Sequence, residues 1–142
     1  MNGLQKLLHL SRKDIQFFME ALTLLFLVKI IVIILPLRWY SKILGTEHKV
    51  SSDESTDLDH IAFKISQAII RGRKAFPWKT RCLCEAISAK IMLNRRHIDC
   101  TLYLGVAKEK GSLIAHAWLR CGSRYVTGKE GVEKFTVVST FA

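Results

Sequence analysis

The sequence predicts an α+β fold, in which helices up to about residue 97 are followed by an antiparallel sheet that packs against them. A strongly apolar run at residues 21–37 is followed by apolar residues at helical spacing between Asp57 and Leu93, whereas from Thr101 onward apolar and polar residues alternate. A chain of 142 residues has the length of one domain with an appended helical element. We therefore expect a central helix against the sheet, preceded by an apolar helical segment.

An apolar segment, residues 17–40, dominates the N-terminal region. Ser11 and Asp14 have the spacing of a capping hydroxyl and carboxylate, which predicts a helix start. The most apolar part, 21–37, contains one charged residue, Lys29. A membrane span needs about 20 apolar residues, and a central lysine costs roughly 2.5–3.5 kcal/mol on insertion scales. Three interpretations stay open: a helix buried against the chain or a partner, an interfacial membrane contact, or a true span.

A polar stretch at residues 45–57 lacks periodicity and is typical of a linker. We predict two parts divided within it: residues 1–48, the apolar and basic N-terminal segment with the start of the linker, and residues 49–142, the core. Apolar residues at helical spacing then predict one helix beginning at Asp57 and another beginning at Cys82. We expect the latter to be the central helix.

Four alternating stretches in the last third predict the strands of one antiparallel sheet. They are residues 101–106, 114–119, 124–127 and 135–141. In the second stretch, alternation places His116 and Trp118 on one face and Ala117 on the other. Glycine-containing turns separate the stretches.

The chain is strongly basic, with 22 Lys and Arg against 12 Asp and Glu and a net charge of +10. Such a charge suits an acidic partner or an anionic membrane surface. Nucleic acid is not expected as a partner, because no zinc-finger spacing, aromatic RNA-binding pattern or recognition helix-turn-helix is visible. The glycines build no phosphate-binding loop, and we expect no cofactor.

The cysteines indicate a reducing compartment. All four lie in predicted helices and strands rather than in a loop-rich framework, and no secretory cleavage site is visible. We therefore expect reduced thiols and a cytoplasmic protein, with membrane association through residues 17–40 left open.

Cys82 is the leading candidate nucleophile because it lies at the start of the central helix. The Pro77-Trp78 pair biases the chain to an extended approach, and Thr80 can cap the helix. The partial positive charge of a helix N-terminus, with Lys79 and Arg81 beside it, favours a thiolate over a thiol.

A thiolate nucleophile needs a base, and histidine suits that role near neutral pH. Only His116, of the five histidines, lies within a predicted strand that could pack across the start of the Cys82 helix. The others lie in the N-terminal segment, in the linker, at a helix start and at the far end of the central helix. A purely structural strand histidine is the alternative.

Motifs along most of the chain agree with one family in order and spacing. They are Leu35-Pro36-Leu37-Arg38, Cys82-Leu83-x-x-Ala86, Arg95-Arg96, Leu102-x-Leu104-Gly105-Val106 and His116-Ala117-Trp118. Together they resemble the transglutaminase-like core of the lasso-peptide leader peptidases. The resemblance implies a papain-like cysteine protease fold in which Cys82 is the nucleophile and His116 the base. Such an enzyme cuts the leader from a ribosomally made precursor.

The resemblance also implies partners: the leader region of a precursor peptide, a separate leader-recognition protein, and the lasso cyclase that closes the released core. We expect residues 17–40 to dock one of these proteins. The alternative is a non-catalytic transglutaminase-like binding module, membrane-associated through the same segment, whose thiol is incidental.

One position departs from the family. The resemblance places an aspartate, the third catalytic residue, at Gly128, which has no carboxylate. Three replacements are open: Thr127, Glu130 or a backbone carbonyl that fixes the imidazole. With a three-residue hairpin loop from Gly122 to Arg124, Glu130 would lie opposite His116 and could orient it; an exposed acid in a glycine turn is the interpretation that we favour for Glu130.

The remaining cysteines have other expected roles. Cys84 is turned away around the helix and is the alternative nucleophile, while Cys100 and Cys121 read as small core residues. A zinc site from Cys82, Cys84, Cys100 and His116 is the competing chemistry. We expect no metal, because the Cys-x-Cys pair lacks the spacer of two to four residues typical of zinc ligands.

Overall fold

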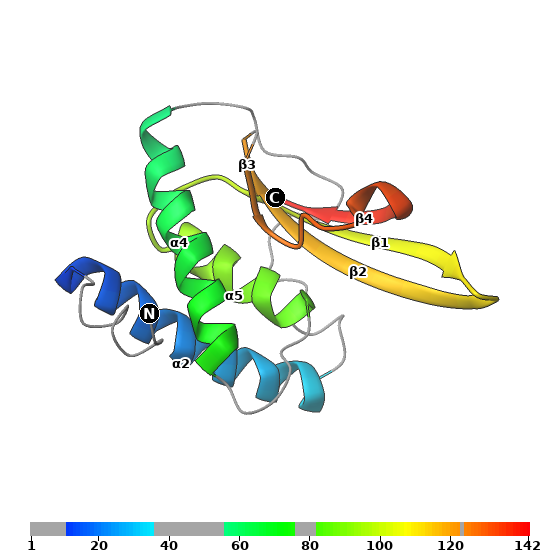
Figure 1. Ribbon diagram of the computed structural model, residues 1–142, viewed down its shortest axis with the longest axis horizontal. Coiled ribbons are helices and arrows are strands. Elements are labelled where there is room, and N and C mark those ends of the chain that lie inside the picture. Colours follow the sequence, from blue (N-terminus) through cyan, green and yellow to red (C-terminus); the bar gives the residue numbers. More distant parts are fainter. Residues whose placement is uncertain (1–10, 36–55, 76–81, 123) are drawn as a thin grey trace, which may run out of the picture.

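Three helices precede a four-stranded antiparallel sheet in the computed structural model of the protein, which describes residues 11–35, 56–75, 82–122 and 124–142 (Figure 1). In chain order the elements are α2 (Arg12–Ile34), α4 (Thr56–Ala75), α5 (Cys82–Asn94), β1 (Thr101–Glu109), β2 (Ser112–Cys121), β3 (Arg124–Thr127), the 3-10 turn η1 (Val132–Lys134) and β4 (Thr136–Phe141). The predicted α+β class and its four strands are confirmed. The predicted division at 48/49 lies outside the described residues.

The sheet has the strand order β3-β2-β1-β4. β1 and β2 form a long hairpin, in which Tyr103 is paired with Trp118 and Gly105 with His116. β4 adds to the free edge of β1. Since β3 and β4 occupy opposite edges, the connection that carries η1 must pass from one edge of the sheet to the other.

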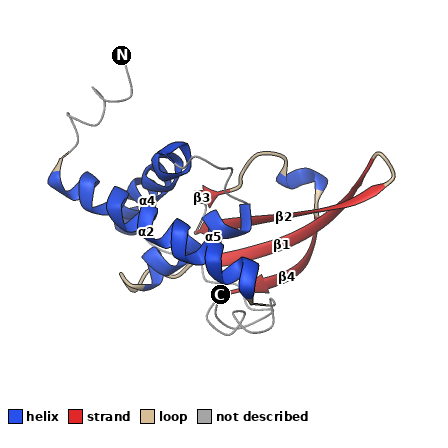
Figure 2. Ribbon diagram, turned by 90° about the horizontal axis from the view of Figure 1, so that it is seen from below, coloured by secondary structure: helices blue, strands red, loops and turns tan. Residues whose placement is uncertain are grey.

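The two faces of the sheet have different partners. Leu102, Ala117 and Leu119 belong to the hydrophobic core that the sheet shares with the helices. The opposite face carries Tyr103 and Trp118, whose rings stack with their centroids 5.6 Å apart. Figure 2 shows the helices gathered at one end of the strands, with the β1–β2 hairpin extending away from them.

α5 is the central helix, as predicted. It contacts α2, α4 and the sheet, and most of its side chains are buried. Even Lys90 is buried, and its ammonium donates a hydrogen bond to the carbonyl oxygen of Cys100 at 3.1 Å. This bond ties α5 to the start of β1.

α2 begins where the sequence predicts. Ser11 and Asp14 form a reciprocal capping box, so the first turn has partners for its exposed amide groups. Ala21, Leu25 and Val28 on its inner side are buried in the core, and Leu25 packs closely on Gly72 of α4. The inner side of α2 is therefore packed against the rest of the chain, as one of the three interpretations predicted.

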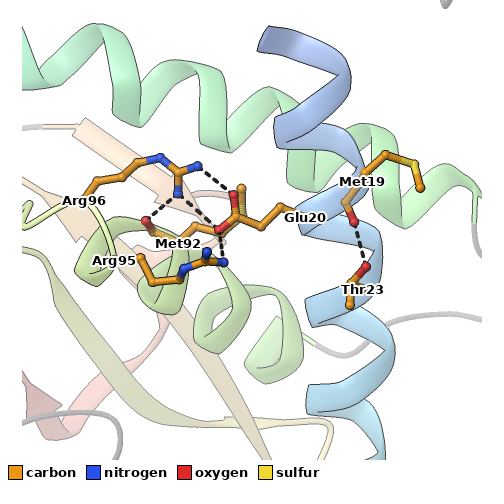
Figure 3. Close-up of polar contacts among 6 residues, drawn as sticks. All are labelled: Met19, Glu20, Thr23, Met92, Arg95 and Arg96. Atoms are coloured by element: carbon orange, nitrogen blue, oxygen red, sulfur yellow. Dashed lines mark hydrogen bonds and ion pairs between the residues drawn. The ribbon is translucent and has the colours of Figure 1, made fainter. Parts of the chain in front are cut away.

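An ion-pair cluster holds α2 to the end of α5 (Figure 3). The Glu20 carboxylate accepts hydrogen bonds from Arg96 at 2.6 Å and from Arg95 at 2.8 Å. Arg96 also donates to the carbonyl oxygen of Met92. By length and composition, α2 is also the one helix among the described residues that could cross a membrane.

Candidate functional site

Cys82 is the first residue of α5 and is half-buried at the edge of the hydrophobic core. At a helix N-terminus the first amide groups lack intrahelical partners and point toward an incoming anion. The Sγ atom makes no hydrogen bond to another described residue. The predicted supports at Pro77-Trp78, Lys79, Thr80 and Arg81 lie outside the described residues.

His116 is fixed on β2 by one polar contact and two aromatic contacts. Its Nε2 atom lies 2.8 Å from the carbonyl oxygen of Gly128. Its ring is 5.0 Å from Phe135 and 5.7 Å from Trp118, measured between centroids. A carbonyl oxygen can only accept, so Nε2 carries the hydrogen in the neutral ring. The lone pair is then on Nδ1, the atom available as a base.

The backbone carbonyl of Gly128 supplies the hydrogen-bond acceptor for His116 that a carboxylate side chain would otherwise supply. Its φ of +71° lies in the left-handed region, and a Cβ atom there would meet the carbonyl oxygen of Ala117 at 2.6 Å. Only glycine therefore fits at this position, where the resemblance to the leader peptidases implies an aspartate. Of the three replacements left open, the backbone carbonyl is the one that contacts His116.

Glu130 does not pair with His116 among the described strands, and its favoured interpretation as an exposed turn residue is confirmed. Cys121 pairs with Arg124, so the hairpin loop is one residue shorter than expected, but the register shift at Leu119 and Arg120 restores the expected register where Leu119 pairs with Thr127. β3 ends at Thr127, so its pairing with β2 does not extend to His116. Glu130 is exposed, while Thr127 is buried without a hydrogen bond from its hydroxyl to another described residue.

Cys82 and His116 belong to different groups of contacts. Cys82 packs against the hydrophobic core, to which Ala117 of β2 also belongs. His116 faces the other way, on the side of Trp118 and Phe135. No hydrogen bond joins the two described side chains. The catalytic roles of both residues stay predictions.

The packing around His116 depends on two residues that sequence reasoning did not assign to the site. Gly105 lies opposite His116 on β1, and a Cβ there would lie 2.9 Å from both the Trp118 ring and Phe135. Phe135 comes from the connection that follows η1. A glycine inside a strand often marks a close approach, so Gly105 carried a usable signal. Phe135 carried none.

The other thiols are poorly suited to be nucleophiles. Cys84 is buried. Burial raises the pKa of Cys100 to about 11, although Lys90 partly offsets the effect. Burial also raises the pKa of Cys121, and Asp59 adds to the effect. Within the part of the chain that the structure describes, no three His, Cys, Asp or Glu residues cluster to hold a metal ion.

A cysteine at the head of a central helix, packed on an antiparallel sheet that carries a histidine, defines the transglutaminase-like class of domain. The family model for the Transglutaminase-like superfamily matches residues 24–140, and the chain belongs to this superfamily. Its members are generally cysteine-protease-like or transferases. No curated protein and no solved structure matches the chain.

Proposed function

We propose that the protein is a cytoplasmic cysteine peptidase that removes the leader from a ribosomally made lasso-peptide precursor. Membership of the superfamily supports cysteine-protease-like chemistry. The substrate class rests on the ordered motifs that resemble the leader peptidases. The observation that carries the proposal is Cys82 at the head of the buried helix α5, in a domain whose strand histidine keeps Nδ1 free.

In the proposed reaction, the thiol proton of Cys82 passes to Nδ1 of His116, and the sulfur attacks the carbonyl carbon of the leader–core peptide bond. The same proton then goes to the departing core amine as the carbon–nitrogen bond breaks. Water hydrolyses the thioester, which releases the leader and restores the thiol. The backbone N–H of Cys82 is the natural oxyanion donor because it heads a helix.

This reaction requires contact between the Cys82 thiol and the His116 ring, and no hydrogen bond joins these two described side chains. We propose that the precursor leader and a separate leader-recognition protein bring the two groups into contact. The lasso cyclase then uses the released core.

A second candidate is a non-catalytic transglutaminase-like binding module. The absence of a hydrogen bond between the described side chains of Cys82 and His116 favours this alternative, because an incidental thiol needs no base.

The two candidates differ in a cleavage assay. Cys82→Ala, His116→Ala and Cys84→Ala variants are each incubated with the precursor and the leader-recognition protein, and products are followed by mass spectrometry. For the peptidase we expect the first two variants to lose about a thousandfold in rate, with Cys84→Ala near wild type. Cleavage that persists in either of the first two variants refutes the pair. If only Cys84→Ala loses cleavage activity, the nucleophile is Cys84 and not Cys82.

A further inference from the structure

The side of α2 that faces away from the domain is apolar and exposed. We call it the outer face and define it by Met19, Phe26, Leu27, Ile30, Ile33 and Ile34. Spacings of three, four and seven residues place these side chains on one side of the helix. Ile33 is 71% exposed and Ile34 is 70% exposed, which is unusual for residues of this type. The outer face therefore lacks a partner among the described residues.

Beyond the first turns of α2, the outer face also has no side-chain hydrogen-bonding group that is available to a partner. Thr23 is exposed on this side, but its hydroxyl donates to the carbonyl oxygen of Met19 at 2.9 Å within the helix (Figure 3). Protein interfaces usually contain about one hydrogen bond per 100–200 Å². A surface of hydrocarbon alone, with its one hydroxyl satisfied internally, suits lipid better than a protein partner.

Contacts on the inner side exclude a transmembrane orientation. Leu25 is fully buried against the other helices, and Glu20 is paired with Arg95 and Arg96. Asp14 at the start of α2 is paired with Lys64 of α4. Passage of α2 through a bilayer would break all of these contacts, whereas a flat orientation keeps them.

Charge around α2 complements an anionic surface. Its two acidic residues, Asp14 and Glu20, are already matched by cations from α4 and from the end of α5. Arg12 and Lys13 at its start are exposed and basic, and the whole chain carries a net charge of +10. Basic groups beside an apolar helix face are the features that bind helices to anionic bilayers.

We propose that α2 is an interfacial membrane anchor, which lies flat on an anionic bilayer with its outer face at the boundary between headgroups and acyl chains. The domain then sits on the membrane surface through α2 without spanning it. The proposal goes beyond the peptidase assignment and does not depend on it, because the contacts involve neither Cys82 nor His116.

Vesicle sedimentation with the whole 142-residue chain tests the proposal. The probes are vesicles of phosphatidylcholine mixed with phosphatidylglycerol, and vesicles of phosphatidylcholine alone. Ile33→Glu on the outer face is matched with Leu113→Glu at the β-hairpin tip, where the side chain is 69% exposed. We expect the wild type to bind the anionic vesicles, Ile33→Glu to bind about tenfold less, and Leu113→Glu to bind as the wild type does. Circular dichroism should show the same fold for all three.

Salt and lipid composition test the charge argument. Binding should fall in high salt and on vesicles without phosphatidylglycerol, and alkaline carbonate should release the protein. Retention in carbonate overturns the flat orientation. Failure of the wild type to bind, or equal binding by Ile33→Glu, overturns the anchor. If Ile33→Glu instead dissociates a wild-type dimer, or abolishes binding to the leader-recognition protein, the outer face is a protein interface and the proposal is wrong.

Discussion

A carbonyl and a carboxylate orient a histidine differently. The Gly128 carbonyl oxygen accepts the hydrogen bond from Nε2 of His116 and so fixes both tautomer and ring orientation. It carries no formal charge, so it stabilises an imidazolium less than an aspartate would. The Gly128 carbonyl thus orients His116 without the electrostatic contribution that a carboxylate would add.

Substitution of Gly128 should be costly for two separable reasons. Gly128→Ala meets both the strain of a positive φ and the clash with the Ala117 carbonyl oxygen, and we expect a loss of about 2–4 kcal/mol in the free energy of unfolding. Gly131→Ala is the matched control, since its φ is +75° but nothing lies within 4 Å of the added Cβ. It should lose only about 1 kcal/mol. Equal losses in urea titrations of the two variants would contradict the close approach at Gly128.

At the scale of the element, the two sides of α2 have opposite roles although their residue types are alike. Leu25 is fully buried and Phe26, the next residue, is 46% exposed. Truncation of a buried leucine leaves a cavity, whereas truncation of an exposed side chain removes few contacts.

The pair Leu25→Ala and Phe26→Ala therefore tests the orientation of α2. We expect Leu25→Ala to lower the free energy of unfolding by about 2–4 kcal/mol and Phe26→Ala to lower it by less than about 1 kcal/mol. Urea unfolding followed by circular dichroism measures both. A larger loss in Phe26→Ala would mean that the helix is rotated about its axis.

Local signals predicted the elements well. The hydroxyl and carboxylate of Ser11 and Asp14 satisfy neighbouring amides, so the four residues from Ser11 to Asp14 are enough to predict the helix start. Alternation likewise placed His116 and Ala117 on opposite faces of a strand. Both rules act within a few residues and need no knowledge of the rest of the fold.

Tertiary arrangement was less predictable. Polar residues are too few in α2 to distinguish Leu25 from Phe26, so the sequence cannot show which side meets the domain. Alternation separates His116 from Ala117 but does not say which face α5 covers. The backbone carbonyl of Gly128 has no side-chain signal at all, and its contact with His116 depends on the register shift between β2 and β3.

At the scale of the whole molecule, titratable groups define the pH range of stability. An ion pair with Arg124 lowers the pKa of Asp59 and ties α4 to β3, so its contribution is present above the usual carboxyl range and is lost in acid. Burial raises the pKa of Cys100 from 9.0 to about 11. At pH values between the pKa of Asp59 and the pKa of Cys100, neither of these two groups changes its charge.

The alkaline limit should depend on Cys100. The folded protein holds the thiol proton more tightly than the unfolded chain does, so unfolding releases it and the stability falls as pH rises from about 9 to about 11. We expect this one group to account for a loss of up to about 2–3 kcal/mol across that range. Cys100→Ala should be less stable at neutral pH because Cys100 is buried, yet its stability should fall less steeply in alkali. Urea titrations of both proteins at several pH values give the two slopes. Parallel slopes would show that the Cys100 thiol ionises as readily in the folded protein as in the unfolded chain.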